Sequence, residues 1–295
     1  VIAYVSDGIS EVSSTYQVYI RTATTGSCGT FTYNGSQRTL ASGGTQVTYT
    51  NNTRTDAGSQ TVAITTNEGY LFSDGEKIKT LTCSIARKSV AEPSCTARTY
   101  NGSSQTMLAA HASADINTNG YSNTAITGTN AGSYSQTLTL SSNYQWSSGS
   151  NVTSNRTKSC SISKVTPTIT LSATSGSIQT GNTTTFKATV KSGCAAKVSG
   201  TLNVTSGTTG VATVTPANTT ITNADNTNGI ATTETVKGEK TTGSSTITVK
   251  FTPSDTTNYN NAANKTYTAT TTARTALYVA SNGNDTSGYG TIADS

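Results

Sequence analysis

The chain has little of what an enzyme needs. It contains one His and 14 acidic residues among 295, and the acids stand singly in stretches typical of turns. No nucleophile motif, zinc-binding motif or Gly-rich phosphate loop occurs in it. Catalysis requires several titratable groups that converge, so we expect no catalytic residues, no cofactor, no bound metal and no enzymatic activity. The scattered acids include Asp7, Glu11, Asp56, Glu68, Asp74, Glu76, Asp115, Asp225 and Asp285.

Charge and long apolar runs are also scarce. Charged residues make up 11% of the chain, and the net charge of +5 is not gathered into a Lys/Arg cluster, which argues against a nucleic-acid partner. No run of 18 apolar residues occurs, so we expect no membrane insertion within this segment. The chain begins in the strand-like stretch "VIAYVSDGIS" without a leader, which favours a segment of a longer protein.

What the chain has in abundance is Thr, Ser, Asn and Gly. Hydrophobic residues are only 32%, which suits thin sandwiches in which every second strand residue is apolar. Short alternating runs such as "TQVTYT", "QTVAIT" and "SQTLTL" are separated by Gly, Asn and Asp. This pattern predicts an all-β fold of tandem immunoglobulin-like β-sandwiches in an extended row.

Part of the sequence is an internal repeat. "TYNGSQRT" at 32–39 returns as "TYNGSSQT" at 99–106, and the stretch that begins "DAGS" at Asp56 returns as "NAGS" at Asn130. A third pair, "CSIARKSV" and "CSISKVTP", closes each copy. The repeat indicates two small domains of one kind rather than a single large core.

The limits of the two copies and the stretches on either side of them predict the domain organisation. Residues 1–26 are the end strands of a preceding β domain or a hairpin, with strands at "VIAYVS" and "STYQVYIRT". The two sandwich repeats cover 27–90 and 91–166, and a bacterial Ig-like domain covers 167–273. Residues 274–295 begin a further β region, which could be a β-helix.

The second repeat carries seven extra residues between its first two motifs, and they include the sole His. "TMLAAHAS" in this insertion, with His111, is the one stretch that could form a helical turn. No His or Cys stands at ligand spacing from His111, and no acid is placed to orient it as a base. We expect a solvent-exposed loop histidine rather than a metal ligand or a catalytic base.

The five cysteines follow the repeat. Each copy has one Cys at its start and one near its end, which predicts the disulfides Cys28–Cys83 and Cys95–Cys160. A four-Cys metal site is disfavoured because no C-x-x-C pair occurs. Disulfides imply an oxidising, extracellular setting. Cys194 is left over, either as a buried free thiol or bonded to something outside this chain.

Aromatic residues and a late Asn-rich stretch raise two alternatives. Exposed Tyr could stack on sugars or proteins, but Tyr33, Tyr70, Tyr100 and Tyr144 recur at matching places, which favours core positions. Trp146 and Phe72 also occupy matching positions in the two copies, which favours a core position for both. The stretch "SNGNDTSG" could offer oxygens of Asn282, Asn284 and Asp285 to calcium, although one carboxylate makes a weak site.

These motifs resemble known families. The ordered "YNGS", "AGS" and "GYLFSDG"/"NYQWSSG" motifs of 27–166 are similar to the MBG-type (mostly β, glycine-rich) repeats of bacterial cell-surface proteins. Residues 167–273, with "FTPSDTTNY", look like the bacterial Ig-like (Big) domains of adhesins and phage virion proteins. The tail "ALYVASNGNDTSGYGTI" resembles the opening of a right-handed parallel β-helix.

The resemblance implies a structural stalk or spacer in an extracellular, adhesin-like surface protein that projects a distal binding region. A host protein, a cell-surface protein or a glycan is then the expected partner. The alternatives are a decoration or fibre protein on a phage virion surface, and a carbohydrate- or protein-binding module.

Overall fold

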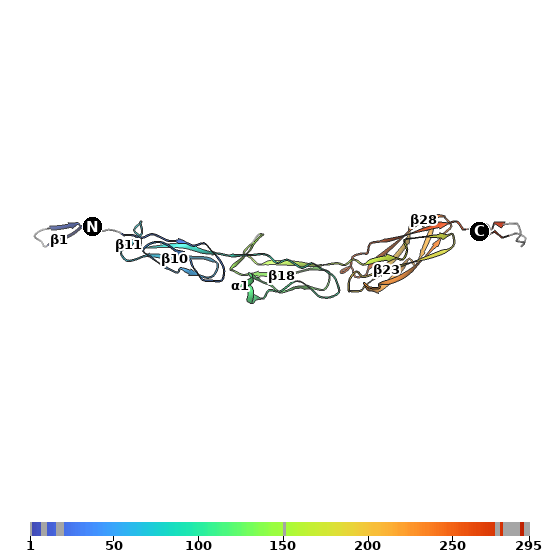
Figure 1. The fold of residues 1–295 in the computed structure, drawn as a ribbon, viewed down its shortest axis with the longest axis horizontal. Helices are drawn as coiled ribbons and strands as arrows, with labels where there is room; N and C mark the ends of the chain where they lie inside the picture. The colour runs from blue at the N-terminus through green and yellow to red at the C-terminus, as the bar shows by residue number, and fades with distance from the viewer. Residues whose placement is uncertain are drawn as a thin grey trace. The chain divides into compact units, whose positions relative to one another are not determined.

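A computed structural model describes residues 2–6, 11–15, 21–149, 152–274, 278–279 and 290–291, and nearly all regular structure in them is β-strand (Figure 1). The predicted all-β class is confirmed. The cause is visible in β10 (Gly58–Thr66), where Val62 and Ile64 are buried and Thr61 before them is exposed. Alternate side chains of a strand point to opposite faces, so one face packs inward while the other stays polar.

The contacts divide the chain into two compact units whose limits do not follow the repeats. The first unit contains residues 1–94, 109–125 and 135–158. The second contains residues 95–108, 126–134 and 159–295. The stretch predicted as the second repeat therefore contributes to both units, and the domain boundaries drawn from the sequence stay predictions.

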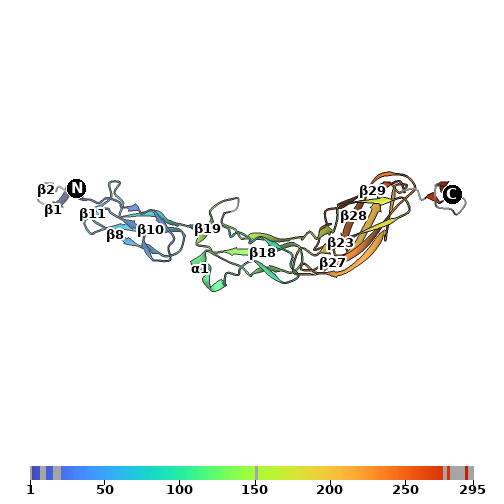
Figure 2. The same ribbon diagram turned by 45° about the vertical axis from the view of Figure 1, so that its right-hand side comes forward.

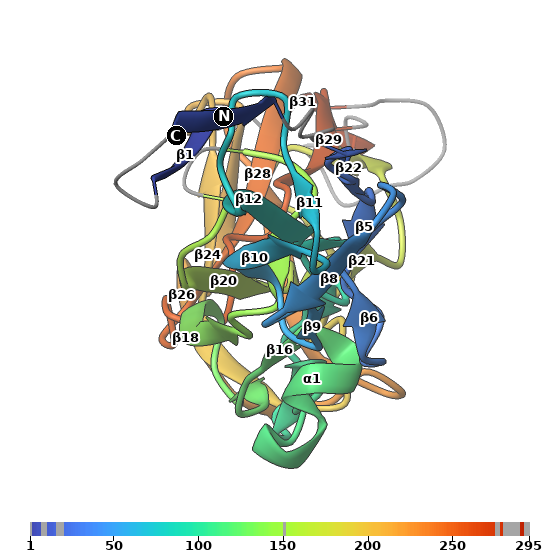
Figure 3. The same ribbon diagram turned by 90° about the vertical axis from the view of Figure 1, so that its left-hand side faces the viewer.

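A four-stranded sheet in the first unit has the order β5–β12–β10–β8. β10 pairs antiparallel with β12 (Ile78–Ala86) and with β8 (Val47–Thr50), and β5 (Phe31–Thr32) joins β12 in parallel. Figure 3 shows β12, β10 and β8 beside one another. One buried cluster beneath this sheet contains Tyr33, Leu40, Ala41, Val62, Cys83 and Ile85 together with Tyr144.

Short strand pairs border the sheet. They are β4 (Ser27–Cys28) with β7 (Ala41–Ser42), β6 (Arg38–Thr39) with β9 (Thr53–Arg54), and β3 (Arg21–Thr22) with β11 (Tyr70–Leu71). Before them, β1 (Ile2–Ser6) and β2 (Glu11–Thr15) form an antiparallel hairpin. The sequence pattern places the second strand at 14–22, whereas β2 begins at Glu11.

The residues of the second repeat form a sheet of the same plan. Its order is β14–β20–β18–β16, which matches β5–β12–β10–β8 strand for strand. β14 (Arg98–Thr99) is parallel to β20 (Arg156–Ser163), and β16 (Tyr121–Ser122) is antiparallel to β18 (Gly132–Leu140). The recurring sequence motifs thus correspond to a recurring strand order.

The predicted helical turn at "TMLAAHAS" is wrong in position. β15 (Gln105–Leu108) covers its first part and pairs with β17 (Ile126–Gly128), because Met107 and Leu108 are buried as strand residues. The helical turns come later, as η1 (Ser113–Asp115) and α1 (Ile116–Asn119). Gly120 ends α1 with a φ of 89°, a left-handed conformation that glycine adopts easily.

The second unit contains a two-sheet sandwich. The first sheet has the order β21–β23–β27–β25, and the second has the order β22–β29–β28–β24–β26. Figure 2 shows β23 with β27 and β28 with β29. The strands are β21 (Thr168–Leu171), β22 (Ser175–Gln179), β23 (Thr183–Lys191), β24 (Val198–Ser206), β25 (Ala212–Thr215), β26 (Asn218–Ala224), β27 (Ile230–Gly238), β28 (Gly243–Pro253) and β29 (Lys265–Thr272).

The core between these two sheets is the largest buried cluster among the described residues. Phe186 stacks on Tyr267 with ring centroids 4.5 Å apart, and Leu202, Val249 and Phe251 are fully buried around them. Beyond this sandwich, the structure gives only the antiparallel pair β30 (Tyr278–Val279) and β31 (Gly290–Thr291). The rest of the expected β-helix start, with the calcium candidates Asn282, Asn284 and Asp285, lies outside the described residues.

Candidate functional site: disulfides and the linker clamp

A disulfide joins the beginning and the end of the first repeat. Cys28 ends β4 and Cys83 lies in β12, with sulfur atoms 2.01 Å apart and Cα atoms 5.4 Å apart. Cys83 is buried because it alternates with Thr82 and Ser84 along β12 and faces the core. The bond closes a loop of 55 residues, so that stretch cannot be pulled straight while the bond is intact.

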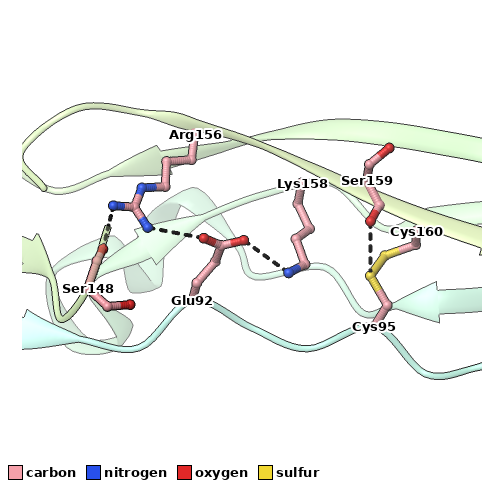
Figure 4. Close-up of polar contacts among 7 residues, drawn as sticks. All are labelled: Glu92, Cys95, Ser148, Arg156, Lys158, Ser159 and Cys160. Carbon is pink, nitrogen blue, oxygen red and sulfur yellow. Dashed lines mark hydrogen bonds and ion pairs between the residues drawn. A yellow bond between two sulfur atoms is a disulfide. The ribbon is translucent and has the colours of Figure 1, made fainter. Parts of the chain in front are cut away.

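An equivalent disulfide joins Cys95 to Cys160 in β20, with Cα atoms 5.7 Å apart and a sequence separation of 65. Cys160 is buried, whereas Cys95 is more accessible and its Sγ lies 3.4 Å from the carbonyl oxygen of Ser159 (Figure 4). Together the two bonds place a covalent link near the first and last strands of each repeat.

The linker before Cys95 is held by a cluster that we call the linker clamp, formed by Glu92, Arg156 and Lys158. The Glu92 carboxylate accepts hydrogen bonds from Lys158 Nζ at 3.0 Å and from Arg156 Nη1 at 3.1 Å (Figure 4). The bond from Lys158, and then that from Arg156, lower the pKa of Glu92 against the opposing effect of burial. Arg156 also lies over the Trp146 ring at 5.3 Å and donates to the Ser148 carbonyl oxygen.

His111 is not the exposed loop residue that we expected. It is half-buried, and its ring stacks on the Tyr121 ring at a centroid distance of 4.8 Å. Its backbone exchanges two hydrogen bonds of 3.0 Å with Asn123, so the insertion folds back onto β16. His111 Nδ1 is buried without a protein partner among the described residues. The stacking could not be inferred from spacing, because two helical turns separate the two rings along the chain.

The acids of the described chain are not brought together. Asp74 pairs with Lys79 at 2.6 Å, and Asp225 Oδ1 accepts three backbone N–H groups in a turn. Asp56 accepts a hydrogen bond from the side chain of Asn143. Across the described residues, no group of three or more His, Cys, Asp or Glu is placed to hold a metal ion. The side chains of Asp7, Glu11 and Asp285 lie outside the described part.

One acid has a setting that the sequence analysis missed. Glu234 in β27 is completely buried and lies opposite Phe186. Its Oε1 accepts the Thr232 hydroxyl at 2.7 Å, while Oε2 has no partner among the described residues. Burial raises the pKa of Glu234. The available signal was its inward position in the alternating run "ATTETVKG" between strand residues that face the core.

Cys194 has no disulfide partner among the described residues. It is half-buried, with Sγ 3.7 Å from the Tyr259 hydroxyl and 3.6 Å from the Ala196 carbonyl oxygen. Burial, followed by the contact with Cys194, raises the pKa of Tyr259. Both interpretations of Cys194, a free thiol and an external bond, stay predictions.

Comparison with known proteins identifies no family. No protein-family profile and no curated protein matches the chain. Among solved structures, domains 4 and 5 of the S-layer protein SbsC match 48% of this chain and 66% of theirs, at 24% identity and a TM-score of 0.28. The S-layer protein rSbsC(31-844) matches 97% of this chain and 46% of its own, at 16% identity and a TM-score of 0.30.

A third structure, covering domains 4–9 of SbsC, matches 70% of this chain at 19% identity and a TM-score of 0.28. This chain spans less than two thirds of the length of each of these solved chains. Within the residues that the structure describes, no helix combines the length and the apolar character needed to cross a membrane.

Proposed function

We propose that the chain is a structural spacer of an extracellular cell-surface protein, without catalytic activity, which carries tension between its two ends. The observation that carries this proposal is the position of the two disulfides. Each links the part of a repeat where the chain arrives to the part where it leaves, as Cys28–Cys83 and Cys95–Cys160. Tension that reaches one cysteine passes through the covalent bond to the other, so the strands between them bear none of it.

The setting belongs to the same proposal. Disulfides persist in oxidising, extracellular surroundings, and the polar exposed faces of the strands suit a protein surrounded by water. The resemblance of the motifs to MBG-type repeats and Big domains supports a stalk that presents an adhesive region to a host protein, a cell-surface protein or a glycan. A virion fibre and a carbohydrate- or protein-binding module stay alternative predictions.

Single-molecule stretching of the full chain from its two ends tests the proposal. In the oxidised chain, the sandwich of β21–β29, which has no disulfide among its described residues, should extend fully, and the two repeats should release only the residues outside their disulfide loops. A reductant should add roughly 180–200 Å to the extension of the first repeat and roughly 210–230 Å to that of the second, since an extended chain spans roughly 3.3–3.6 Å per residue.

The matched control is Cys194→Ser, which removes the cysteine that has no disulfide partner among the described residues. It should leave the extension of the oxidised and of the reduced chain unchanged. Equal extension of the oxidised and the reduced chains would mean that the disulfides carry no tension, and the spacer proposal would then fail.

A further inference from the structure

In the first unit, the side chain of Asn143 joins two segments that are far apart in the sequence. Its Oδ1 accepts a hydrogen bond from the backbone N–H of Ala57 at 2.8 Å, and its Nδ2 donates to Asp56 Oδ1 at 2.9 Å. Asn143 is only 6% exposed. Buried polar groups are costly without partners, so this reciprocal contact fixes the start of the second-repeat strand β19 (Tyr144–Trp146) against the first repeat.

The residue after Asn143 contributes an aromatic contact to the same place. The rings of Tyr33 and Tyr144 meet edge to face with centroids 5.6 Å apart, and both are buried. Beside them, β13 (Lys88–Val90) runs parallel to β19, and the Lys88 N–H donates to the Asn143 carbonyl oxygen at 3.0 Å. The amide, the ring pair and the linker strand form one junction.

In the second unit, Asn258 makes the same amide contacts with different residues. Its Oδ1 accepts the backbone N–H of Ala131 at 2.7 Å, and its Nδ2 donates to Asn130 Oδ1 at 3.2 Å. The same Nδ2 also donates to Asp255 Oδ2, in its own sandwich, at 2.8 Å. Asn258 is also 6% exposed. Asn130 therefore takes the place of Asp56 and accepts the hydrogen bond through an amide oxygen, while a carboxylate acceptor is supplied by Asp255.

The aromatic and strand contacts recur as well. Tyr100 and Tyr259 meet edge to face with centroids 5.5 Å apart. The linker residue Val165 forms a parallel bridge with Tyr259, and its N–H donates to the Asn258 carbonyl oxygen at 3.0 Å. Two separate places in the chain thus share a set of four contacts in one arrangement.

The recurring motifs of the repeats supply one side of both junctions. Tyr33 and Tyr100 are the tyrosines of "YNGS", and Ala57 and Ala131 are the alanines of "DAGS" and "NAGS". We call the tyrosine, the alanine and the residue before the alanine the docking face of a repeat. The other side is an Asn–Tyr pair, Asn143–Tyr144 in one junction and Asn258–Tyr259 in the other.

The domains that present the Asn–Tyr pair are not alike. Asn143–Tyr144 follows β18 of a small repeat, whereas Asn258–Tyr259 lies between β28 and β29 of the larger sandwich. What they share is the dipeptide and its contacts. The first repeat has Gly69 and Tyr70 at the equivalent place, where Tyr70 still pairs in parallel with Arg21 of β3 but glycine provides no side-chain amide.

We propose that the docking face is a recognition surface for the next domain, and that its partner is any sandwich presenting a buried Asn–Tyr pair beside a parallel linker strand. The asparagine determines specificity, because its amide satisfies both the alanine N–H and the side chain before it. This inference does not rest on the proposed spacer role, since it concerns how neighbouring domains bind each other.

Amide hydrogen exchange of the full, ¹⁵N-labelled chain tests the proposal. Asn143→Ala should speed exchange of the Ala57 amide about tenfold or more and leave the Ala131 amide unchanged, and Asn258→Ala should do the reverse. Asn203→Ala is the matched control, because the Asn203 amide donates to Ala217 and Asn218 within the larger sandwich. This control variant should leave the exchange rates of the Ala57 and Ala131 amides unchanged.

A charge swap separates recognition from a general loss of packing. Asn143→Asp puts a carboxylate against the Asp56 carboxylate and should expose the Ala57 amide. Adding Asp56→Asn should restore its protection, because the amide introduced at position 56 can donate to the new carboxylate. Asn258→Asp should likewise expose the Ala131 amide, because Nδ2 of Asn258 also donates to Asp255 Oδ2 at 2.8 Å, and the new carboxylate would lie against the Asp255 carboxylate.

Three results would count against the proposal. One is an Ala57 amide that exchanges at the wild-type rate in Asn143→Ala. Another is faster exchange of both the Ala57 and the Ala131 amides in each single variant, which would mark loss of the fold rather than of one junction. The third is failure of the double variant to restore protection, which would remove the specificity role of the asparagine.

Discussion

At the scale of single residues, Glu234 shows how burial changes an acid. The folded chain holds its carboxyl group away from water, so its pKa is raised above that of the unfolded chain. Its contribution to stability is therefore present in full below the unfolded pKa and is lost as the pH rises through the folded pKa. Above that pH, this side chain weakens the sandwich that contains it.

Glu234→Gln should stabilise the chain in mild alkali and have little effect in acid, because Gln has the shape of the protonated acid and keeps the Thr232 hydrogen bond. The difference in unfolding free energy between Glu234→Gln and the wild type should grow as the pH rises from the unfolded to the folded pKa of Glu234. The growth should be at most about 1.4 kcal/mol per pH unit. Denaturant unfolding at pH 4 and pH 8 measures it.

Glu239→Gln is the control with the opposite sign. Hydrogen bonds from Thr213 and then Lys237 lower the pKa of Glu239, so its contribution is present above the unfolded pKa and lost as the pH falls. Removing that acid should destabilise the chain at pH 8. Equal pH dependence of Glu234→Gln and wild type would contradict a raised pKa at Glu234.

At the scale of elements, the insertion of the second repeat supports a residue of the junction. The Tyr144 hydroxyl lies 2.7 and 3.2 Å from the carbonyl oxygens of Asn117 and Thr118 and donates to them, which satisfies carbonyl groups at the end of α1. Gly120 lies directly against the Tyr144 ring, where an added Cβ would be 2.7 Å from a ring carbon. The short helix thus positions the tyrosine that meets Tyr33.

Gly120→Ala should therefore cost more than a glycine replacement in open space. The control is Gly181→Ala, which has a similar φ of 80° and no atom within 4 Å of the new Cβ. The left-handed conformation alone should cost about 1 kcal/mol in both variants, and overpacking against Tyr144 should add about 1–3 kcal/mol in Gly120→Ala.

Thermal unfolding of the two variants measures the difference, and the Ala57 amide reports whether the junction is disturbed. We expect faster exchange of that amide in Gly120→Ala only. Identical unfolding free energies for the two variants would show that the ring moves aside without cost.

At the scale of the whole molecule, two means of stabilisation are combined. The larger sandwich has an extensive apolar core and no disulfide among its described residues. The first repeat has smaller apolar clusters, and each repeat has one disulfide. Small domains with little apolar surface to bury commonly depend on such covalent links. Reduction of the two disulfides should therefore lower the stability of the repeats and leave that of the larger sandwich unchanged.

Scanning calorimetry of the full chain with and without a reductant checks this expectation. Reduction should lower the unfolding free energy of each repeat by about 4 kcal/mol, the chain-entropy value for loops of this length, and leave the transition of the larger sandwich in place. Cys194→Ser should not change either profile. A shift of every transition by the same amount would indicate that the domains unfold as one unit.

The places where sequence reasoning succeeded and failed follow from the range of the interactions involved. Alternation along β10 and β12 is a local property, so the all-β class could be predicted and is confirmed. The helical turn was misplaced because "TMLAA" has no strand signal of its own, and Met107 becomes a strand residue only by pairing across to β17. His111 was placed in solvent because its stacking on Tyr121 depends on how the insertion folds back.

The sequence by itself determined the strand class, the repetition of one stretch of motifs and the placement of one cysteine at each end of each copy, since these depend on local periodicity and on direct comparison of two stretches. Only the tertiary structure decided which residues meet. Asp56 and Asn143 are 87 residues apart, and Asn130 and Asn258 are 128 apart, so no local pattern relates them. Their contact exists because a parallel strand pairing holds the two segments side by side, and there a buried N–H requires a partner.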